Sequence, residues 1–228
     1  MTNKKLAIFV EGQTEVIFTE KLIIEILGHK NVSINSVKAR QGLAEISASK
    51  FDEQSFYVLI FDCEGDDSVK SQILEKREAL IKNQFDSIIG LRDVYPIESN
   101  NIQRLEMGLK TGVPTKNISI SIFIAKMEVE AWFLQESNHY RKIHPSLTDK
   151  HILQKTNFCP STHNAEDVYH PAELLNKIYN LAGFSYKKNK RQTTRTVQSL
   201  DYEELYINLP SSLPYLKKFI DYLDAFFI

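Results

Sequence analysis

The stretch KLAIFVEGQTEVIFTEKLIIEILG, residues 5–28, decides the fold. It begins with an uninterrupted apolar run, Leu6–Val10, which is too short for a helix and rich in β-branched and aromatic residues, as is typical of a strand covered on both faces. After an acidic turn at Glu11, apolar residues recur at helical spacing until Gly28, with Thr14 as the expected N-cap. The stretch therefore predicts a buried parallel strand, a turn and a helix, with Glu11 at the carboxyl end of the strand.

A second acidic turn follows the next buried strand, which we expect at Phe56–Phe61. Asp62 comes directly after it and Glu64 two residues later. Residues two apart in an extended chain point the same way, so we expect both carboxylates on one side of the sheet edge. Ligands of open α/β sheets bind at the carboxyl ends of the strands, where Glu11 is also expected. Several acids together favour a hard ion, Mg²⁺ or Mn²⁺, and such an ion supports chemistry on phosphate.

The remaining pattern predicts an α/β fold followed by a helical region. We expect further strands at 31–38, 87–91 and 117–125, and helices at 42–50, 68–83 and 100–110. This alternation is typical of a parallel, doubly wound sheet flanked by helices. After it, short helices are expected at 128–135, 171–183 and 212–227. We therefore predict an α/β core over residues 1–135 and a helical lobe, packed on the core, over residues 136–228.

Composition limits the class of protein. Of the 228 residues, 43% are hydrophobic and 25% are charged, which is ordinary for a globular protein with a sizeable core. The net charge of −1 gives no global basic field, so nucleic-acid binding would need a local patch. Two cysteines do not make a disulfide scaffold, and no apolar run approaches the ~20 residues of a membrane span. We therefore expect a cytoplasmic protein without a membrane partner.

The two acidic turns together resemble the TOPRIM domain of topoisomerases, primases and OLD-type nucleases. The resemblance is carried by VEGQTE, residues 10–15, after one strand and by Asp62-Cys63-Glu64 after another. It implies a Rossmann-like parallel sheet and a nuclease in which the first Glu and an Asp-x-Asp pair hold Mg²⁺. By this resemblance Glu11 takes the first role, Asp62 and Glu64 form the pair, and Glu15 is a supporting acid. Glu64 stands where the usual pattern has Asp, so its side chain reaches further.

Three later segments resemble a compact bacterial TOPRIM family of OLD-like and AbiL-type phage-defence nucleases, similar in plan to the effector of the PARIS system. They are GLRDVYP at 90–96, MEVEAWFL at 127–134 and YKK at 186–188. The resemblance implies a toxic effector of abortive infection that cleaves RNA, tRNA or DNA and is controlled by a partner ABC-type ATPase. The oligomeric state stays open, a homo-oligomer included.

Further polar residues follow the later strands. Arg92 and Asp93 come after the strand expected at 87–91. Either they form a surface ion pair, or Asp93 supports the metal while Arg92 contacts a phosphate. Glu128 and Glu130 flank the start of the helix expected at 128–135; one of them caps the helix, and Glu130 is the better candidate for the site. Lys126 either neutralises charge on a phosphate or pairs with an acid of the cluster.

A basic run, YKKNKRQTTR at 186–195, contains five basic residues and no acid. Most charge runs are solvated faces, which is the alternative here. An acidic metal edge on a nearly neutral protein needs cations elsewhere to hold a polyanion. We therefore expect the run to contact the substrate backbone while its tyrosine stacks on a base, and the residues concerned are Tyr186, Lys187, Lys188, Arg191 and Arg195.

Two other classes of function remain open. A phosphorylation-controlled receiver module also has acids after its first strand, an acceptor Asp after its third and a Lys after its fifth, which Glu11, Asp62 and Lys126 match. A non-catalytic subunit of an ATPase complex would use the acids to bind a structural metal. The chain has no GxxxxGK sequence, so ATP binding by the chain itself is not expected. Its Cys and His residues lack zinc-site spacing.

Overall fold

The computed structural model describes residues 4–28, 31–40, 55–65, 68–114 and 116–227. These residues form two compact units, which we describe one after the other. The first unit comprises Met1–Arg92, Asn100–Ile124 and Phe227, and the second comprises Asp93–Ser99 and Ala125–Phe226. Residue 135, where the sequence analysis sets the boundary between core and lobe, lies inside the second unit.

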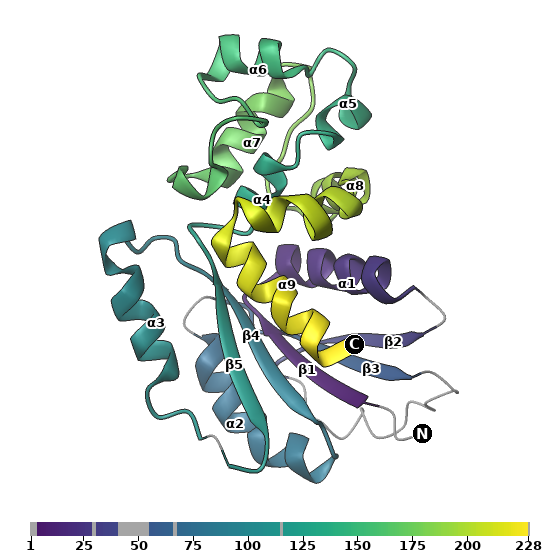
Figure 1. The fold of residues 1–228 in the computed structure, drawn as a ribbon, viewed down its shortest axis with the longest axis vertical. Helices are drawn as coiled ribbons and strands as arrows, with labels where there is room; N and C mark the ends of the chain where they lie inside the picture. Colours follow the sequence, from purple (N-terminus) through teal and green to yellow (C-terminus); the bar gives the residue numbers. More distant parts are fainter. Residues whose placement is uncertain (1–3, 29–30, 41–54, 66–67, 115, 228) are drawn as a thin grey trace. The chain divides into compact units, whose positions relative to one another are not determined.

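A five-stranded sheet in the order β2-β3-β1-β4-β5 is the centre of the first unit (Figure 1). β1 pairs in parallel with β3 and with β4, and β2 pairs in parallel with β3. The predicted strands and the parallel α/β sheet are confirmed. The strands are β1 (Lys4–Val10), β2 (Val32–Lys38), β3 (Phe56–Asp62), β4 (Ser87–Asp93) and β5 (Ser119–Ala125).

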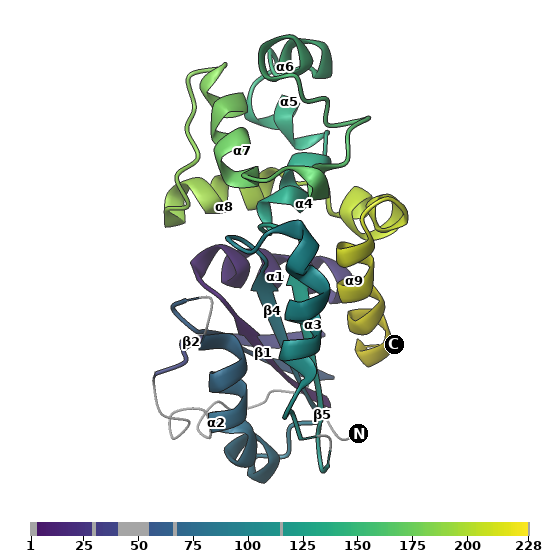
Figure 2. The same cartoon turned by 90° about the vertical axis from the view of Figure 1, so that its left-hand side faces the viewer.

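Helices cover both faces of this sheet. They are α1 (Gln13–Leu27), α2 (Ser68–Lys82) and α3 (Ile102–Lys110), the last preceded by the 3₁₀ turn η2 (Ser99–Asn101). α1 contacts β2 and β3, whereas Val69 and Ile73 of α2 share a buried cluster with Phe9 of β1. Figure 2 shows α1 and α2 on opposite sides of the strands. The expected doubly wound arrangement is therefore confirmed, and the helix predicted at 42–50 lies outside the described residues.

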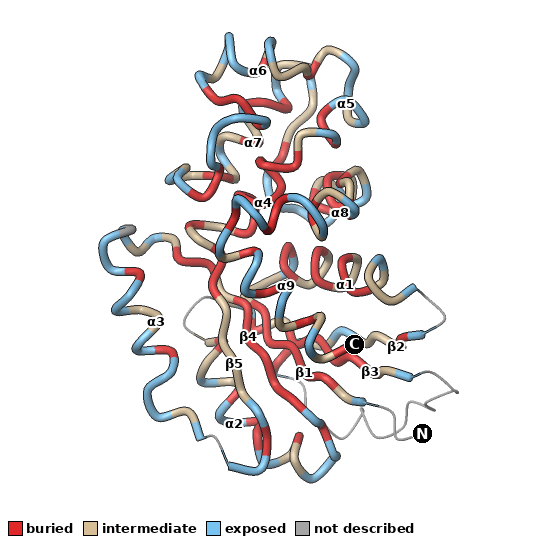
Figure 3. The backbone as a smooth tube through the Cα atoms, viewed as in Figure 1, coloured by how far each residue is buried: buried red, intermediate tan, exposed pale blue. Residues whose placement is uncertain are grey.

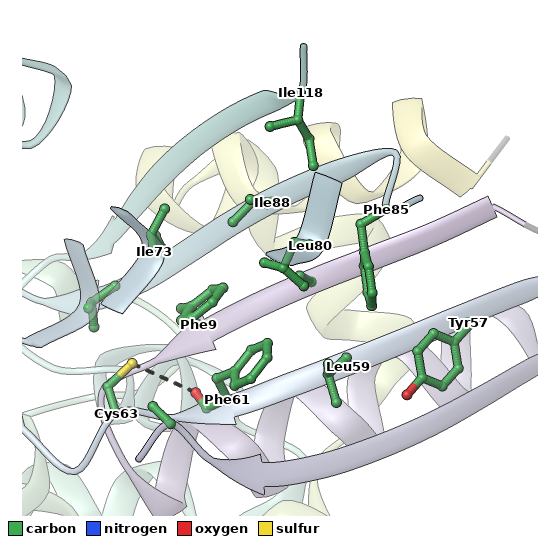
Figure 4. Close-up of a cluster of buried hydrophobic side chains, with 13 residues drawn as sticks. Phe9, Tyr57, Leu59, Phe61, Cys63, Ile73, Leu80, Phe85, Ile88 and Ile118 are labelled. Carbon is green, nitrogen blue, oxygen red and sulfur yellow. Dashed lines mark hydrogen bonds between the residues drawn. The ribbon is translucent and has the colours of Figure 1, made fainter. Parts of the chain in front are cut away.

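The core of the first unit is closely packed between α2 and the central strands. The rings of Phe9 and Phe61 stack with centroids 4.3 Å apart, and both side chains are completely buried (Figure 4). Figure 3 shows that buried residues run along most of β1, β3 and β4. Strands buried on both faces require continuous apolar runs, so polar side chains are placed at the strand ends.

The turn between β1 and α1 differs slightly from the expectation. Gly12, not Thr14, is the N-cap residue of α1, and its N–H donates to Oε2 of Glu15 over 2.9 Å. Thr14 is buried in the first turn of the helix. Glu15 is buried as well, so the acid expected to support the metal closes the helix start through a hydrogen bond typical of a capping box.

The second unit is helical. The sequence pattern missed α5, α6 and α8 because they are short and polar; the buried positions of α8 include Thr193 and Thr196, which give no apolar periodicity. No helix among the described residues is long and apolar enough to cross a membrane. The helices are α4 (Glu130–Gln135), α5 (His139–Ile143), α6 (Asp149–Thr156), α7 (Pro171–Asn180), α8 (Lys190–Ser199) and α9 (Pro214–Phe227), with the short turns η3 (Ala165–Asp167), η4 (Glu204–Asn208) and η5 (Leu209–Ser211).

The packing of β4 against α2 and β5 leaves no room for a side chain at Gly90. A Cβ there would lie 3.0 Å from Val69, 3.1 Å from Ile73 and 3.2 Å from Ile122. We expect Gly90→Val to lower the free energy of unfolding by roughly 2 kcal/mol, because extra methyl groups displace packed neighbours. Gly108→Ala on α3 is the control: nothing lies within 4 Å of its Cβ. It should stabilise by about 0.5–1 kcal/mol. Urea unfolding checks both, and an unchanged midpoint for Gly90→Val would contradict this packing.

Candidate functional site

Glu11 and Asp62 lie at the carboxyl ends of two neighbouring parallel strands. Val10, the last residue of β1, is in register with Asp62, the last residue of β3. Beyond the strands, the N–H of Cys63 donates to the carbonyl of Val10 over 2.9 Å, and the N–H of Gly65 donates to the carbonyl of Glu11 over 3.0 Å. Both acids are half-buried. The pairing of β1 with β3 therefore brings the backbone of these two predicted site residues to the same sheet edge.

The thiol of Cys63 lies close to both acids. Burial raises the pKa of this thiol to about 12, and the carboxylates of Asp62 and Glu11 contribute to the rise while Lys76 opposes it. A thiol with such a pKa is protonated at neutral pH. Burial is the main cause of the raised pKa, and the carboxylates at the ends of β1 and β3 add to it.

Glu64 does not continue the strand. β3 ends at Asp62, and Glu64 adopts a left-handed backbone conformation with φ of 56° while its N–H donates to Oδ1 of Asp62 over 3.0 Å. Its carboxylate lies 2.6 Å from Nζ of Lys38 and 3.7 Å from Nε of Arg40, and the hydrogen bond from Lys38 lowers the pKa of Glu64. The expected extended segment from Asp62 to Glu64 is wrong, because the chain turns between the two acids.

The second unit contains a tight group of acids that we call the acid cluster: Asp93 at the end of β4, Glu128 before α4, and Glu130 at the start of α4. Their carboxylates offer one oxygen each within 4.8 Å of one another. Asp93 and Glu130 are buried, and the side chain of Glu128 is 12% exposed. Among the described residues, these three acids form such a group, whereas Glu11, Asp62 and Glu64 do not.

Each carboxylate of the acid cluster is held by a hydrogen bond from a fixed donor. The N–H of Val129 donates to Asp93 over 2.9 Å, and the N–H of Ala172 donates to Glu128 over 2.8 Å. The hydroxyl of Tyr186 donates to Oε1 of Glu130 over 2.7 Å. Backbone turns and α7 thus fix the positions of the carboxylates before any ligand is present.

One ammonium group enters the acid cluster. Nζ of Lys188 lies 2.8 Å from Oε1 of Glu128 and 3.1 Å from Oε2 of Glu130. Burial raises the pKa of Glu130. Desolvation alone would lower the pKa of Lys188, but the carboxylates of Glu130, Asp93 and Glu128 raise it above its ordinary value. Both Glu130 and Lys188 therefore hold their protons more tightly than usual, as expected where carboxylates outnumber ammonium groups.

The donor atoms of the acid cluster suit a hard divalent cation, since they are carboxylate oxygens only. Oε2 of Glu130 is buried and accepts no hydrogen bond from the described residues, although it is ion-paired with Lys188. The cluster thus fits such an ion if the Lys188 ammonium moves aside. In the first unit, Glu11 and Asp62 offer two half-buried carboxylates of the same chemical kind.

Two residues of the basic run have structural roles that its sequence did not indicate. Tyr186 is only 2% exposed, so its ring is not placed to stack on a base, contrary to the expectation. Arg195 donates from Nη2 to the carbonyl of Ser185 over 2.6 Å and lies over the rings of Tyr179 and Phe184. Tyr186 is held by its hydrogen bond to Glu130 and its ring contact with Tyr179, and Arg195 by the contacts just described, so neither side chain is free to meet a substrate.

The other predicted residues are distributed over both units. Lys187 and Arg191 are exposed, as substrate contact requires. Nζ of Lys126 lies 2.6 Å from Oδ1 of Asp167 in η3, so it pairs with an acid outside the predicted cluster, which differs from the pair that was expected. Arg92 is half-buried on β4 and belongs to the first unit. Glu128 joins Glu130 in the cluster, whereas the sequence favoured a site role for only one of the two.

Comparisons of the chain with protein-family models, with curated proteins and with solved structures found no match. The functional interpretation therefore depends on the geometry and the charges of these acids and of the cations around them.

The ion pairs of Lys188 predict a loss of stability when its ammonium is removed. We expect Lys188→Met to lower the free energy of unfolding by roughly 1–3 kcal/mol, because two acids lose a partner while water partly screens this 39% exposed side chain. The control is Lys187→Met, an exposed neighbour whose backbone N–H, not its ammonium, bonds Gln192; it should change stability by under about 0.5 kcal/mol. Thermal denaturation without divalent cations compares the two, and equal losses would contradict the assigned role.

The raised pKa of Glu130 predicts a pH dependence. Its folded-state pKa lies above the unfolded value, so the folded protein binds this proton more tightly. The resulting stabilisation is complete below the unfolded pKa and is lost as the pH rises through the folded pKa. We expect the wild type to lose stability relative to Glu130→Gln as the pH rises above 4.5, the ordinary pKa of a Glu carboxyl. Urea unfolding of both proteins in a chelator measures the difference, and a difference that is constant with pH would refute the raised pKa.

Proposed function

We propose that this protein is a Mg²⁺- or Mn²⁺-dependent nuclease with a TOPRIM-type core. The observation that carries the proposal is the in-register parallel pairing of β1 with β3, which ends at Val10 and Asp62 and places Glu11 directly after β1 at the same sheet edge. Carboxyl ends of parallel strands are the usual ligand edge of an open α/β sheet. Acids at this edge favour a hard cation over an apolar or zinc-type ligand.

In this proposal Glu11 and Asp62 hold the ion, and Glu64 joins them by giving up its contacts with Lys38 and Arg40. A divalent ion held by these residues would supply Lewis-acid chemistry, polarising the scissile phosphate and lowering the pKa of a bound water. A carboxylate oxygen of Glu11 accepts the proton of the attacking water. Glu15 keeps the turn closed through its hydrogen bond to the N–H of Gly12, so it orients Glu11 without contacting the substrate.

The acid cluster of Asp93, Glu128 and Glu130 supports the proposal as a second place where a cation is favoured. The cluster has three carboxylates and one ammonium group, that of Lys188, which contacts Glu128 and Glu130. The pKa values of Glu130 and Lys188 are both raised, so this place favours the binding of a positive charge. Structural ion-pair networks also shift pKa values, so the cluster supports metal chemistry in general rather than one reaction.

The substrate class in this proposal is nucleic acid, RNA, tRNA or DNA. Lys187 lies before α8, and Lys190 and Arg191 lie in its first turn. All three side chains are exposed, and in this proposal they contact the phosphate backbone. Lys188 and Arg195 are assigned instead to the ion pairs and ring contacts that they make. The cellular role that we propose is that of a cytoplasmic abortive-infection toxin controlled by an ABC-type ATPase, which is based on the family resemblance alone.

The receiver-module alternative is less well supported. In such a module the Lys after the fifth strand would act on the phosphorylated Asp62, but Lys126 pairs with Asp167 of η3. No observation in either unit favours the structural-metal alternative over a catalytic site.

The proposal predicts that cleavage depends on Glu11 and Asp62. We expect Glu11→Gln and Asp62→Asn to reduce Mg²⁺- or Mn²⁺-dependent cleavage roughly 100-fold or more while the fold is retained. Because Glu64 is paired with Lys38 and Arg40, Glu64→Gln should cost less, about tenfold. The control is Glu20→Gln, a half-buried acid on α1, which should leave activity unchanged.

Labelled single-stranded DNA, duplex DNA, RNA and tRNA are the substrates for this assay, with circular dichroism as the check on folding. Wild-type protein that cleaves none of them with either ion, alone or with its partner, would contradict the proposed function. Full activity of Glu11→Gln would contradict the assigned site.

A further inference from the structure

Three aromatic rings of the second unit pack against one another beside the segments that hold the acid cluster. The ring centroids of Tyr95 and Tyr169 are 5.8 Å apart, those of Tyr95 and His170 5.2 Å, and those of Tyr169 and His170 4.5 Å. All three pairs are edge-to-face, with interplanar angles of 70°, 61° and 75°. We call this group the aromatic triad.

The triad is attached to the acid cluster through short backbone links. Tyr95 comes two residues after Asp93, and its N–H donates over 2.8 Å to the carbonyl of Met127, the residue before Glu128. His170 comes two residues before Ala172, whose N–H donates to Glu128. The segments that fix two of the three carboxylates thus also fix two of the three rings.

One ring of the aromatic triad, that of Tyr169, is exposed to solvent, and the polar atoms of the three side chains are available for hydrogen bonds. Tyr169 is 47% exposed, although two other rings hold it in place. The structure records only ring contacts for these side chains, and among the described residues neither tyrosine hydroxyl nor the His170 imidazole has a hydrogen-bond partner. Scattered exposed aromatics are ordinary on protein surfaces, but a rigid aromatic cluster beside buried acids combines a stacking surface with a site for a cation.

We infer that the aromatic triad is a stacking platform for one unpaired nucleobase of a single-stranded nucleic acid, with Tyr169 as the ring that meets the base. This inference rests on the proposed function, because it takes a nucleic acid as the ligand. An aromatic ring offers a π-face to every base, so the platform selects single strands over duplexes and tolerates different sequences.

Binding is tested separately from cleavage. All variants are made in the Glu11→Gln background with Mg²⁺ present, and fluorescence anisotropy of a labelled 12-nucleotide single strand gives Kd. We expect Tyr169→Ala to weaken binding about tenfold, as stacking energies suggest, and Tyr169→Phe to stay within about twofold. The control is Ile207→Ala, which removes a 62% exposed apolar side chain from the same unit and should not change Kd.

A second oligonucleotide, in which abasic positions replace the bases, distinguishes stacking from a structural role. The effect of Tyr169→Ala should disappear with this ligand and be small with duplex DNA. An unchanged Kd for Tyr169→Ala, an equal loss with the abasic strand, or no binding of any single strand by the parent protein would each overturn the inference.

These outcomes are distinguishable from failure of the proposed function. If wild-type protein cleaves nothing but the parent protein binds single strands in a Tyr169-dependent way, the platform stands and the nuclease proposal fails. If wild-type protein cleaves nucleic acid but Tyr169→Ala binds as well as its parent, only the platform is wrong.

Discussion

The in-register pairing of β1 with β3 is the constraint on which the proposed site depends. β1 is buried on both faces, with Phe9 stacked on Phe61 of β3 and Leu6 and Ile8 also fully buried. Acids cannot be accommodated inside such strands, so they follow at the strand ends. A slip of one residue would turn Phe9 to the other face of the sheet. It would also remove the hydrogen bonds that join the turn at Glu11 to the turn after Asp62.

Both groups of acids are stabilised locally by cations and by backbone donors. Glu64 is paired with Lys38, and Glu128 and Glu130 are paired with Lys188. This pairing lowers the free-energy cost of placing several carboxylates close together. The pKa of Glu130 in the acid cluster nevertheless stays raised, because the carboxylate is buried. Carboxylates with a shifted pKa are more common at functional sites than elsewhere, so the acid cluster supports metal chemistry, whereas the functional proposal depends on Glu11 and Asp62 at the sheet edge.

The sequence predicts the sheet well and the contacts of the site poorly. Continuous apolar runs such as Leu6–Val10 predict buried strands because no other element explains that pattern. The turn at Glu64 was missed because strand alternation was extended past the last apolar residue. Lys188 was expected to contact the substrate backbone, since its contact with Glu130, 58 residues earlier in the chain, is a tertiary contact that no local pattern encodes. The burial of Tyr186 could not be predicted for the same reason, since its partner Glu130 is also distant in the chain.

The claim that Glu11 and Asp62 share a divalent cation is tested most directly by anomalous diffraction from crystals soaked in Mn²⁺. Our account predicts an anomalous peak with carboxylate oxygens of both residues within about 2.5 Å of it. A well-ordered sheet edge without a peak at these two side chains, at a Mn²⁺ concentration that supports cleavage, would contradict it.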